Sequence, residues 1–288
     1  MTRTTPWTAA LIGAAVLGML AVLVLGVAWH LQGGRWFVTT SPSMGQEMPV
    51  GSFLATTPST VSATAVGDVV TFRSPTSGTV FTHRVVGKDA AGLETQGDVN
   101  GVPDAWRITD AELVGQVAWH TEVLGWALRA LPLLLAGLAV VWLLTRWATP
   151  VRRRSWRLLG SSAVVAVVGW WLSPWVGLSR LGQQAAPEGE KGVMMDVIST
   201  GLLPIRASEV GGSAHAVLAN GQVGQLHLTA GADTGAFDVG AALHLPWWGW
   251  VVLGLVLLLP LLWSVVASLV SPVDPAPRGG SRRREVAA

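Results

Sequence analysis

The chain has 288 residues, of which 50% are hydrophobic, 12% are charged and 16 are tryptophan, and its formal net charge is +2. A soluble globular protein usually carries about a quarter charged residues, so the composition argues against that class. The small net charge gives no reason to expect nucleic acid as a partner. The sequence contains no cysteine, which excludes disulfides, a cysteine nucleophile and thiolate metal sites.

Four apolar stretches account for the shortage of charge. They run from Trp7 to Trp29, from Val123 to Leu144, from Leu158 to Gly177 and from Leu245 to Val270. Each reaches the roughly 20 residues that a helix needs to cross a hydrocarbon core. We therefore expect four transmembrane helices and the lipid bilayer as a partner.

Arginines outside these stretches predict the orientation. They precede the first stretch (Arg3), separate the second from the third (Arg146, Arg152, Arg153, Arg154, Arg157) and follow the fourth (Arg278, Arg282, Arg283, Arg284). Basic residues stay on the cytoplasmic side, so the polar segments 30–122 and 178–244 are expected outside. The first apolar stretch is longer than a secretory h-region and has no small-x-small exit, which indicates an uncleaved signal-anchor.

The predicted fold class is a multi-pass protein of the cell (plasma) membrane with two extracytoplasmic β domains. Its parts are a signal-anchor helix (1–29), an all-β domain (30–122), a second membrane helix (123–147), a basic cytoplasmic loop (148–157), a third helix (158–177), a second small β domain (178–244), a fourth helix (245–270) and a basic cytoplasmic tail (271–288).

Short strand patterns separated by Pro-, Gly- and Ser-rich turns predict the first β domain. The expected strands are Trp36–Thr40, Ser52–Thr57, Asp68–Phe72, Val80–Val86 and Leu113–Trp119.

Three passages in this domain form an ordered set. The first is Ser41-Pro42-Ser43-Met44. The second is Gly67-Asp68-Val69-Val70-Thr71-Phe72, followed by Thr82-His83-Arg84-Val85. The third is Gly97-Asp98-Val99-Asn100, with a further aspartate at Asp104.

With these motifs, residues 8–145 resemble type I signal peptidases of the branch found in the endoplasmic reticulum, archaea and sporulating bacteria, which uses histidine where most bacterial enzymes use lysine. The resemblance implies a signal-peptidase-like catalytic domain, a serine endopeptidase activity without metal or cofactor, and the signal peptides of exported preproteins as substrates. It assigns Ser43 as the nucleophile and His83 as the general base and acid. It leaves open whether Asp104 or Asp98 orients the histidine.

The resemblance also implies the surroundings of the nucleophile. The Ser43 backbone N–H and the Ser41 hydroxyl correspond to the family's oxyanion donors, and Met44 is expected to wall the site. The chain departs from the family after Ser-Met, where x-Pro-Thr is usual and Gly45-Gln46-Glu47 stands here. This departure keeps open an inactive relative that acts as an export or assembly factor, or a protease dedicated to a few exported partners.

The second outer segment gives no comparable motif. Its expected strands are Val193–Ser199, Pro204–Val210, Ala214–Leu218, Val223–Thr229 and Phe237–Leu243, with Asn220-Gly221 as a hairpin turn. Its candidate metal ligands are His215, His227, Asp196 and Asp233. They lack a recognised ligand spacing, so we interpret them as surface residues and expect no metal. Its function stays open between recruiting the substrate, shielding it and docking on the first domain.

Overall fold

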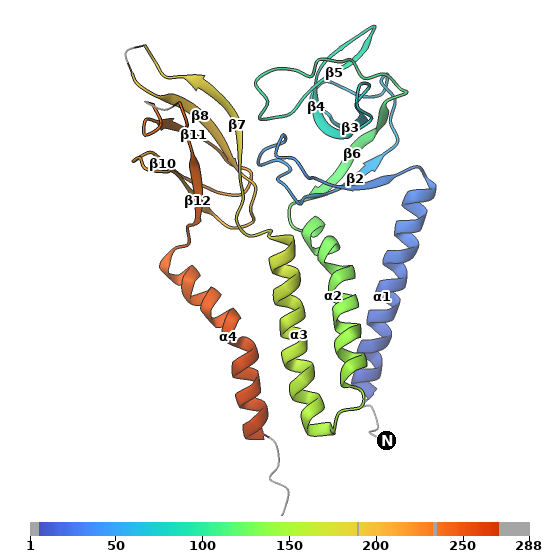
Figure 1. Ribbon diagram of the computed structural model, residues 1–288. Helices are drawn as coiled ribbons and strands as arrows, with labels where there is room; N and C mark the ends of the chain where they lie inside the picture. Colours follow the sequence, from blue (N-terminus) through green and yellow to red (C-terminus); the bar gives the residue numbers. More distant parts are fainter. Residues whose placement is uncertain (1–5, 189, 233–234, 271–288) are drawn as a thin grey trace, which may run out of the picture. The chain divides into compact units, whose positions relative to one another are not determined.

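The structure is a computed structural model that describes residues 6–188, 190–232 and 235–270 (Figure 1). In these ranges the chain forms four helices and twelve strands. The helices are α1 (Pro6–Leu31), α2 (Leu124–Thr145), α3 (Pro150–Leu172) and α4 (Trp247–Val270). The predicted basic tail (271–288), Arg3 and the candidate ligand Asp233 lie outside the described residues.

The four helices coincide with the four predicted apolar stretches, but the expected fold class is wrong. Among the described residues, only α2 is both long enough and apolar enough to cross a membrane. The apolar parts of α1 and α4 found there are shorter, Val16–Leu31 and Trp247–Leu262. The described residues therefore contain one candidate span and not the four predicted, and most of their elements are strands.

The start of α3 explains part of this difference. The sequence predicted a basic loop over 148–157, but α3 begins at Pro150 and includes the arginines of that loop. Arg153 donates to the carbonyl oxygens of Arg146 and Ala148, at 2.9 and 3.0 Å, just beyond the end of α2. Cations are stabilised at a helix C-terminus, so the end of α2 favours the guanidinium of Arg153 at this position. The first turns of α3 are therefore charged, although the sequence predicted an apolar helix that begins only after these arginines.

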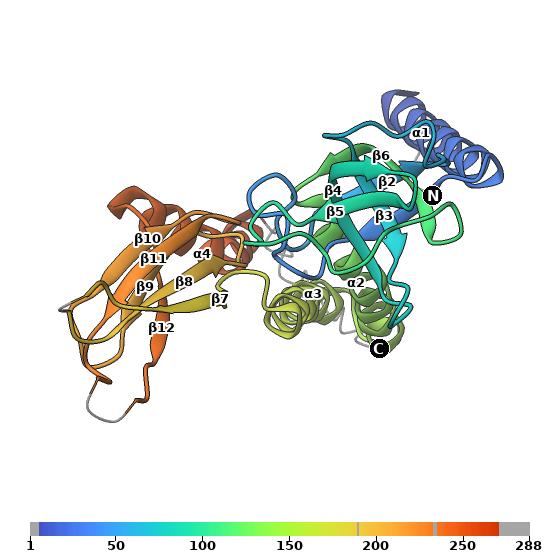
Figure 2. The ribbon, with the colours of Figure 1, turned by 90° about the horizontal axis from the view of Figure 1, so that it is seen from above.

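The first β module is one antiparallel sheet of six strands (Figures 1 and 2). Its order is β1-β2-β6-β3-β4-β5. Five of the strands overlap the predicted ones, and β5 was not predicted. The bounds are β1 (Arg35–Val38), β2 (Phe53–Thr57), β3 (Val69–Arg73), β4 (Val80–Asp89), β5 (Gly92–Gln96) and β6 (Leu113–Thr121).

Two buried clusters stabilise this module. One contains Val70 and Phe72 of β3 with Val85 of β4, and it continues to Leu93 and Ile108. Each fully buried side chain of this kind contributes about 1.5–3 kcal/mol relative to exposure. The other cluster joins Met44 and Met48, in the loop between β1 and β2, to Leu54 of β2. This loop carries Ser43.

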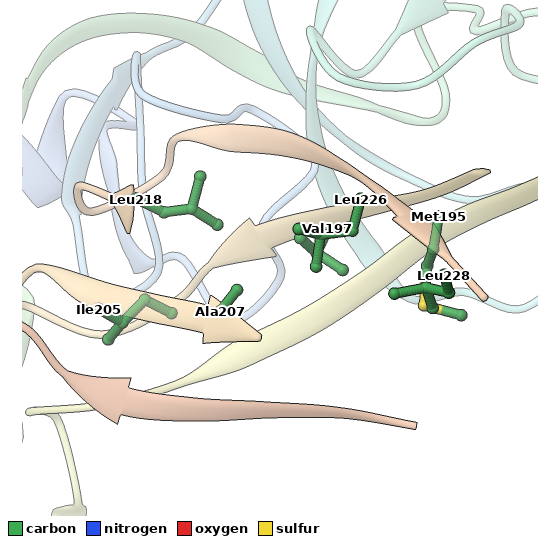
Figure 3. Close-up of a cluster of buried hydrophobic side chains, with 7 residues drawn as sticks. All are labelled: Met195, Val197, Ile205, Ala207, Leu218, Leu226 and Leu228. Carbon is green, nitrogen blue, oxygen red and sulfur yellow. The ribbon is translucent and has the colours of Figure 1, made fainter. Parts of the chain in front are cut away.

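The second β module is formed by two three-stranded sheets, β10-β9-β12 and β11-β8-β7. Seven side chains from the two sheets form its buried core (Figure 3). The sequence missed β7, which has no regular alternation of apolar residues. The strands are β7 (Leu178–Ala185), β8 (Val193–Ser199), β9 (Ile205–Glu209), β10 (His215–Leu218), β11 (Val223–Leu228) and β12 (Val239–Leu243).

The predicted hairpin at Asn220-Gly221 is partly wrong. Gly221 has the positive φ of 70° that such a turn requires. However, β10 pairs with β9, and β11 pairs with β8. The turn therefore links the two sheets, and it does not close a two-stranded ladder.

Candidate active site

Ser43 lies in a tight turn in the loop between β1 and β2. The Gly45 N–H donates to the Pro42 carbonyl at 2.9 Å, which closes the turn around Ser43. The Val99 N–H donates to the Ser43 carbonyl at 3.1 Å. The backbone of the serine is thus held by its own turn and by the loop that follows β5.

His83 lies on β4 and its imidazole is almost fully buried, with 3% of the residue exposed. The ring packs beside Phe81 and Phe72, with centroid distances of 5.6 and 6.0 Å. Its Nδ1 lies 2.7 Å from Asp104 Oδ2, and its Nε2 lies 3.1 Å from Ser43 Oγ. Because a carboxylate can only accept, Nδ1 carries the proton and Nε2 accepts from the Ser43 hydroxyl.

The two aspartates that the sequence offered as partners of His83 have different contacts in the structure. Asp104 contacts His83, whereas Asp98 forms a bidentate pair with Arg84. The two oxygen–nitrogen distances of that pair are 2.9 and 2.7 Å. Asp98 raises the pKa of the Arg84 guanidinium through its hydrogen bond and its charge, against a smaller opposing effect of burial. Asp98 is therefore not placed to orient the histidine.

The two residues expected beside the nucleophile lie at different depths. Ser41 Oγ is 3.2 Å from Ser43 Oγ, so its hydroxyl can reach an oxyanion that forms next to the nucleophile. Met44 is 2% exposed and packs against Met48 and Leu54. Its side chain forms the floor of the site.

A cavity of about 200 Å³ opens beside the nucleophile. Ser41, Ser43 and Met44 line it on one side, and Phe37, Leu54 and Phe81 add apolar surface. Pockets for drug-sized ligands usually measure about 300–1,000 Å³. This cavity therefore suits one or two small side chains of an extended peptide.

The structure shows how Gly45, Gln46 and Glu47, which follow Ser43-Met44, are accommodated in the loop. Gly45 has a φ of +55°, in the left-handed region that favours glycine. The Glu47 carboxylate lies 3.8 Å from His120 Nε2 on β6, and its charge also raises the pKa of Arg84 slightly. In this arrangement the loop keeps Ser43 in contact with His83 and has no proline between Met44 and Met48.

Of the four candidate metal ligands, His215, His227 and Asp196 lie among the described residues, and each contacts another group of the protein. Within the described residues, no group of three or more His, Cys, Asp or Glu side chains is arranged to hold a metal ion. His215 contacts the Ser213 carbonyl, and His227 contacts the Lys191 carbonyl. Asp196 accepts from Gln225 at 3.0 Å.

Sequence reasoning missed one residue of the site. Thr95 on β5 donates from Oγ1 to Asp104 Oδ2 at 2.6 Å. β5 has no strong apolar alternation, so neither the strand nor the inward direction of Thr95 was predicted. The only available signal was its place two residues before Gly97 in the third motif passage.

Ser43, His83 and Asp104 supply a hydroxyl, a base and a carboxylate in the order that activates a hydroxyl nucleophile. The imidazole can take the Ser43 proton and later return it to a leaving group. A buried carboxylate fixes the tautomer and stabilises the imidazolium that forms. The sequence matches no protein-family model, and it matches no curated protein.

Proposed function

We propose that the protein is a membrane-bound serine endopeptidase that removes signal peptides from exported preproteins, with its first β module on the outer face of the plasma membrane. The observation that carries the proposal is the chain of contacts from Ser43 Oγ to His83 Nε2, at 3.1 Å, and from His83 Nδ1 to Asp104 Oδ2, at 2.7 Å. The motif order that resembles type I signal peptidases supports the substrate class.

The proposed reaction follows from these contacts. Ser43 Oγ attacks the scissile carbonyl while its proton moves to His83 Nε2. The Ser41 hydroxyl, 3.2 Å from the nucleophile, donates to the oxyanion. The imidazolium then protonates the departing amine, and the acyl-enzyme forms. A water molecule, deprotonated by His83, releases the carboxylate product and regenerates Ser43.

A membrane location is supported by the connection between the Ser43 loop and α2. The Trp126 indole N–H, near the start of α2, donates to the Val50 carbonyl at 3.1 Å. The Gly51 N–H in turn donates to the Thr39 carbonyl at the other end of the same loop. The loop that carries Ser43 is thus attached to the first turn of α2, the candidate membrane span. The bond cut in a signal peptide would lie just beyond the substrate's own hydrophobic segment, so both would be close to the membrane surface.

The size of the cavity favours small residues next to the cut. About 200 Å³ beside Ser43 accommodates small residues better than aromatic ones. We therefore expect small residues such as alanine next to the cut and poor cleavage when phenylalanine replaces them.

The test is cleavage of a labelled preprotein with an Ala-x-Ala site by the full-length protein in membranes. The native protein is expected to cut at that site, and Ser43→Ala is expected to abolish cutting. Ser77→Ala, at an exposed serine of another turn, is the matched control and should retain full activity. Equal cleavage by the native and Ser43→Ala proteins would remove the basis of the proposal.

The same assay distinguishes the alternatives. An inactive relative that serves as an export factor would leave every preprotein uncut. A dedicated protease would cut exported proteins encoded near its own gene and leave the generic preprotein intact.

A further inference from the structure

Asp104 is held by a second side chain besides His83. Its Oδ2 accepts from Thr95 Oγ1 at 2.6 Å and faces His83 Nδ1 at 2.7 Å. The Asp104 N–H also donates to the Thr95 carbonyl at 2.8 Å. Thr95 therefore binds both the backbone and the carboxylate of the residue that orients the imidazole.

The strand register explains why Thr95 reaches this position. Thr95 on β5 pairs with Val85 on β4, and His83 is two residues from Val85. Since side chains alternate along a strand, Thr95 and His83 project from the same face of the sheet. Asp104, in the segment after β5, lies over that face and contacts both.

The hydrogen bond from Thr95 to Asp104 begins at a buried hydroxyl, so water cannot replace it. Thr95 is 0% exposed, so its hydroxyl is out of reach of water and needs a partner inside the protein. A hydroxyl that donates to a carboxylate forms one of the stronger hydrogen bonds in proteins. It also limits rotation of the carboxylate, because Oδ2 must satisfy two donors at once.

We propose that Thr95 is a positioning residue for the Ser43–His83–Asp104 site, holding Asp104 so that Oδ2 faces His83. The inference rests on the proposed function. Thr95 does not line the cavity beside Ser43, so it acts on turnover and not on substrate binding. It leaves the chemical steps to the other three residues.

The test compares Thr95→Val, Thr95→Ala and Thr95→Ser in the full-length protein. The first two remove the hydroxyl and should lower kcat by about 10- to 100-fold, the usual effect of losing a hydrogen bond to a charged group, with KM within about twofold. Thr95→Ser restores the donor and should recover most of kcat. The rate at which a fluorophosphonate labels Ser43 should follow kcat.

The matched control is Thr64→Val. Thr64 is 1% exposed, and its Oγ1 donates to the Thr60 carbonyl at 2.9 Å, away from Asp104. This variant also loses a buried hydroxyl, so it shows what general destabilisation does to kcat. It should lower the melting temperature and leave kcat close to that of the native protein.

A spectroscopic readout separates positioning from stability. The Nδ1 proton of His83, shared with Asp104, should give a downfield signal in ¹⁵N-histidine-labelled protein. This signal should shift or broaden in Thr95→Ala and stay in place in Thr64→Val. If Thr95→Val does not fold, Thr95→Ala and Thr95→Ser decide the question.

The inference is overturned if the two variants without the hydroxyl keep kcat within about twofold of the native value, or if Thr95→Ser fails to recover it. An unchanged His83 signal in Thr95→Ala would also overturn it. Ser43→Ala separates this outcome from failure of the proposed function. If Ser43→Ala loses activity while Thr95→Ala keeps it, only the positioning role is wrong. If the native protein neither cleaves nor reacts at Ser43, both fall together.

Discussion

Asparagine substitutions at Asp104 and Asp98 should have very different effects on turnover. Asp104→Asn removes the negative charge next to the imidazolium that forms during the reaction. Two unit charges about 4 Å apart attract by about 4 kcal/mol at an effective dielectric constant of about 20. We expect kcat to fall by about three orders of magnitude, since about 1.4 kcal/mol corresponds to a factor of ten.

Asp98→Asn changes an ion pair that is partly open to water. The side chains of Arg84 and Asp98 are 32% and 25% exposed, and pairs of this kind usually contribute up to about 1 kcal/mol. Even if all of that reached the transition state, kcat would fall by only about fivefold. The amide oxygen of asparagine can still accept from Arg84, which keeps the turn that contacts Ser43.

The assay is single-turnover cleavage of a labelled preprotein by reconstituted full-length protein. Melting temperatures of both variants establish that they fold. A larger loss in Asp98→Asn than in Asp104→Asn would refute the assignment of Asp104 as the orienting carboxylate, and so would equal losses.

Two further results are expected. Burial alone would raise the pKa of Glu209, but the N–H groups of Ala230, Thr229 and Ala214 bring it below its usual value of 4.5. The stabilisation from ionised Glu209 is therefore present above about pH 4.5 and lost as the pH falls through the lower folded-state pKa; thermal unfolding of Glu209→Gln should show a weaker acid dependence, and an unchanged dependence would contradict this. Gly51→Ala should destabilise the protein by about 1–3 kcal/mol, because φ is +89° and a Cβ would lie 1.8 Å from Trp126 Nε1. Gly67→Ala, with φ of +99° and nothing within 4 Å, should lower the melting temperature less, and equal losses would exclude a role for the Trp126 contact.

Local pattern predicted most of the strands, because alternation and turn residues act over a few positions. It failed for β5 and β7, whose sequences Gly92–Gln96 and Leu178–Ala185 are largely polar. These strands form through pairing with β4 and β8, and such pairing partners are not visible in a local window. The turn at Gly221 was predictable because Asn-Gly is a local turn signal. That β10 and β11 belong to different sheets was not predictable, because their pairing partners lie elsewhere in the chain.

The apolar stretches located the helices, but among the described residues only α2 is a candidate span. The basic cluster around Arg153 was assigned to a loop, yet the helix that contains it begins at Pro150. Proline is favoured at the first position of a helix, so the start at Pro150 had a local signal. The contacts of Arg153 with the carbonyl oxygens just beyond α2 had none, because they depend on how the two helices meet.

The motif order was enough to nominate Ser43 and His83. It could not choose between Asp98 and Asp104, because five residues of loop lie between them and only the path of that loop decides which carboxylate meets the imidazole. Thr95 was invisible for a related reason. Its role depends on the register between β4 and β5, which no short motif encodes.

The most direct measurement is to treat the native protein with a fluorophosphonate and locate the adduct by peptide mass spectrometry. We expect the phosphonate on Ser43 Oγ and almost none when His83→Ala removes the base. An adduct on another serine, or none on Ser43 in the native protein, would mean that the 3.1 Å contact between Ser43 and His83 does not create a nucleophile.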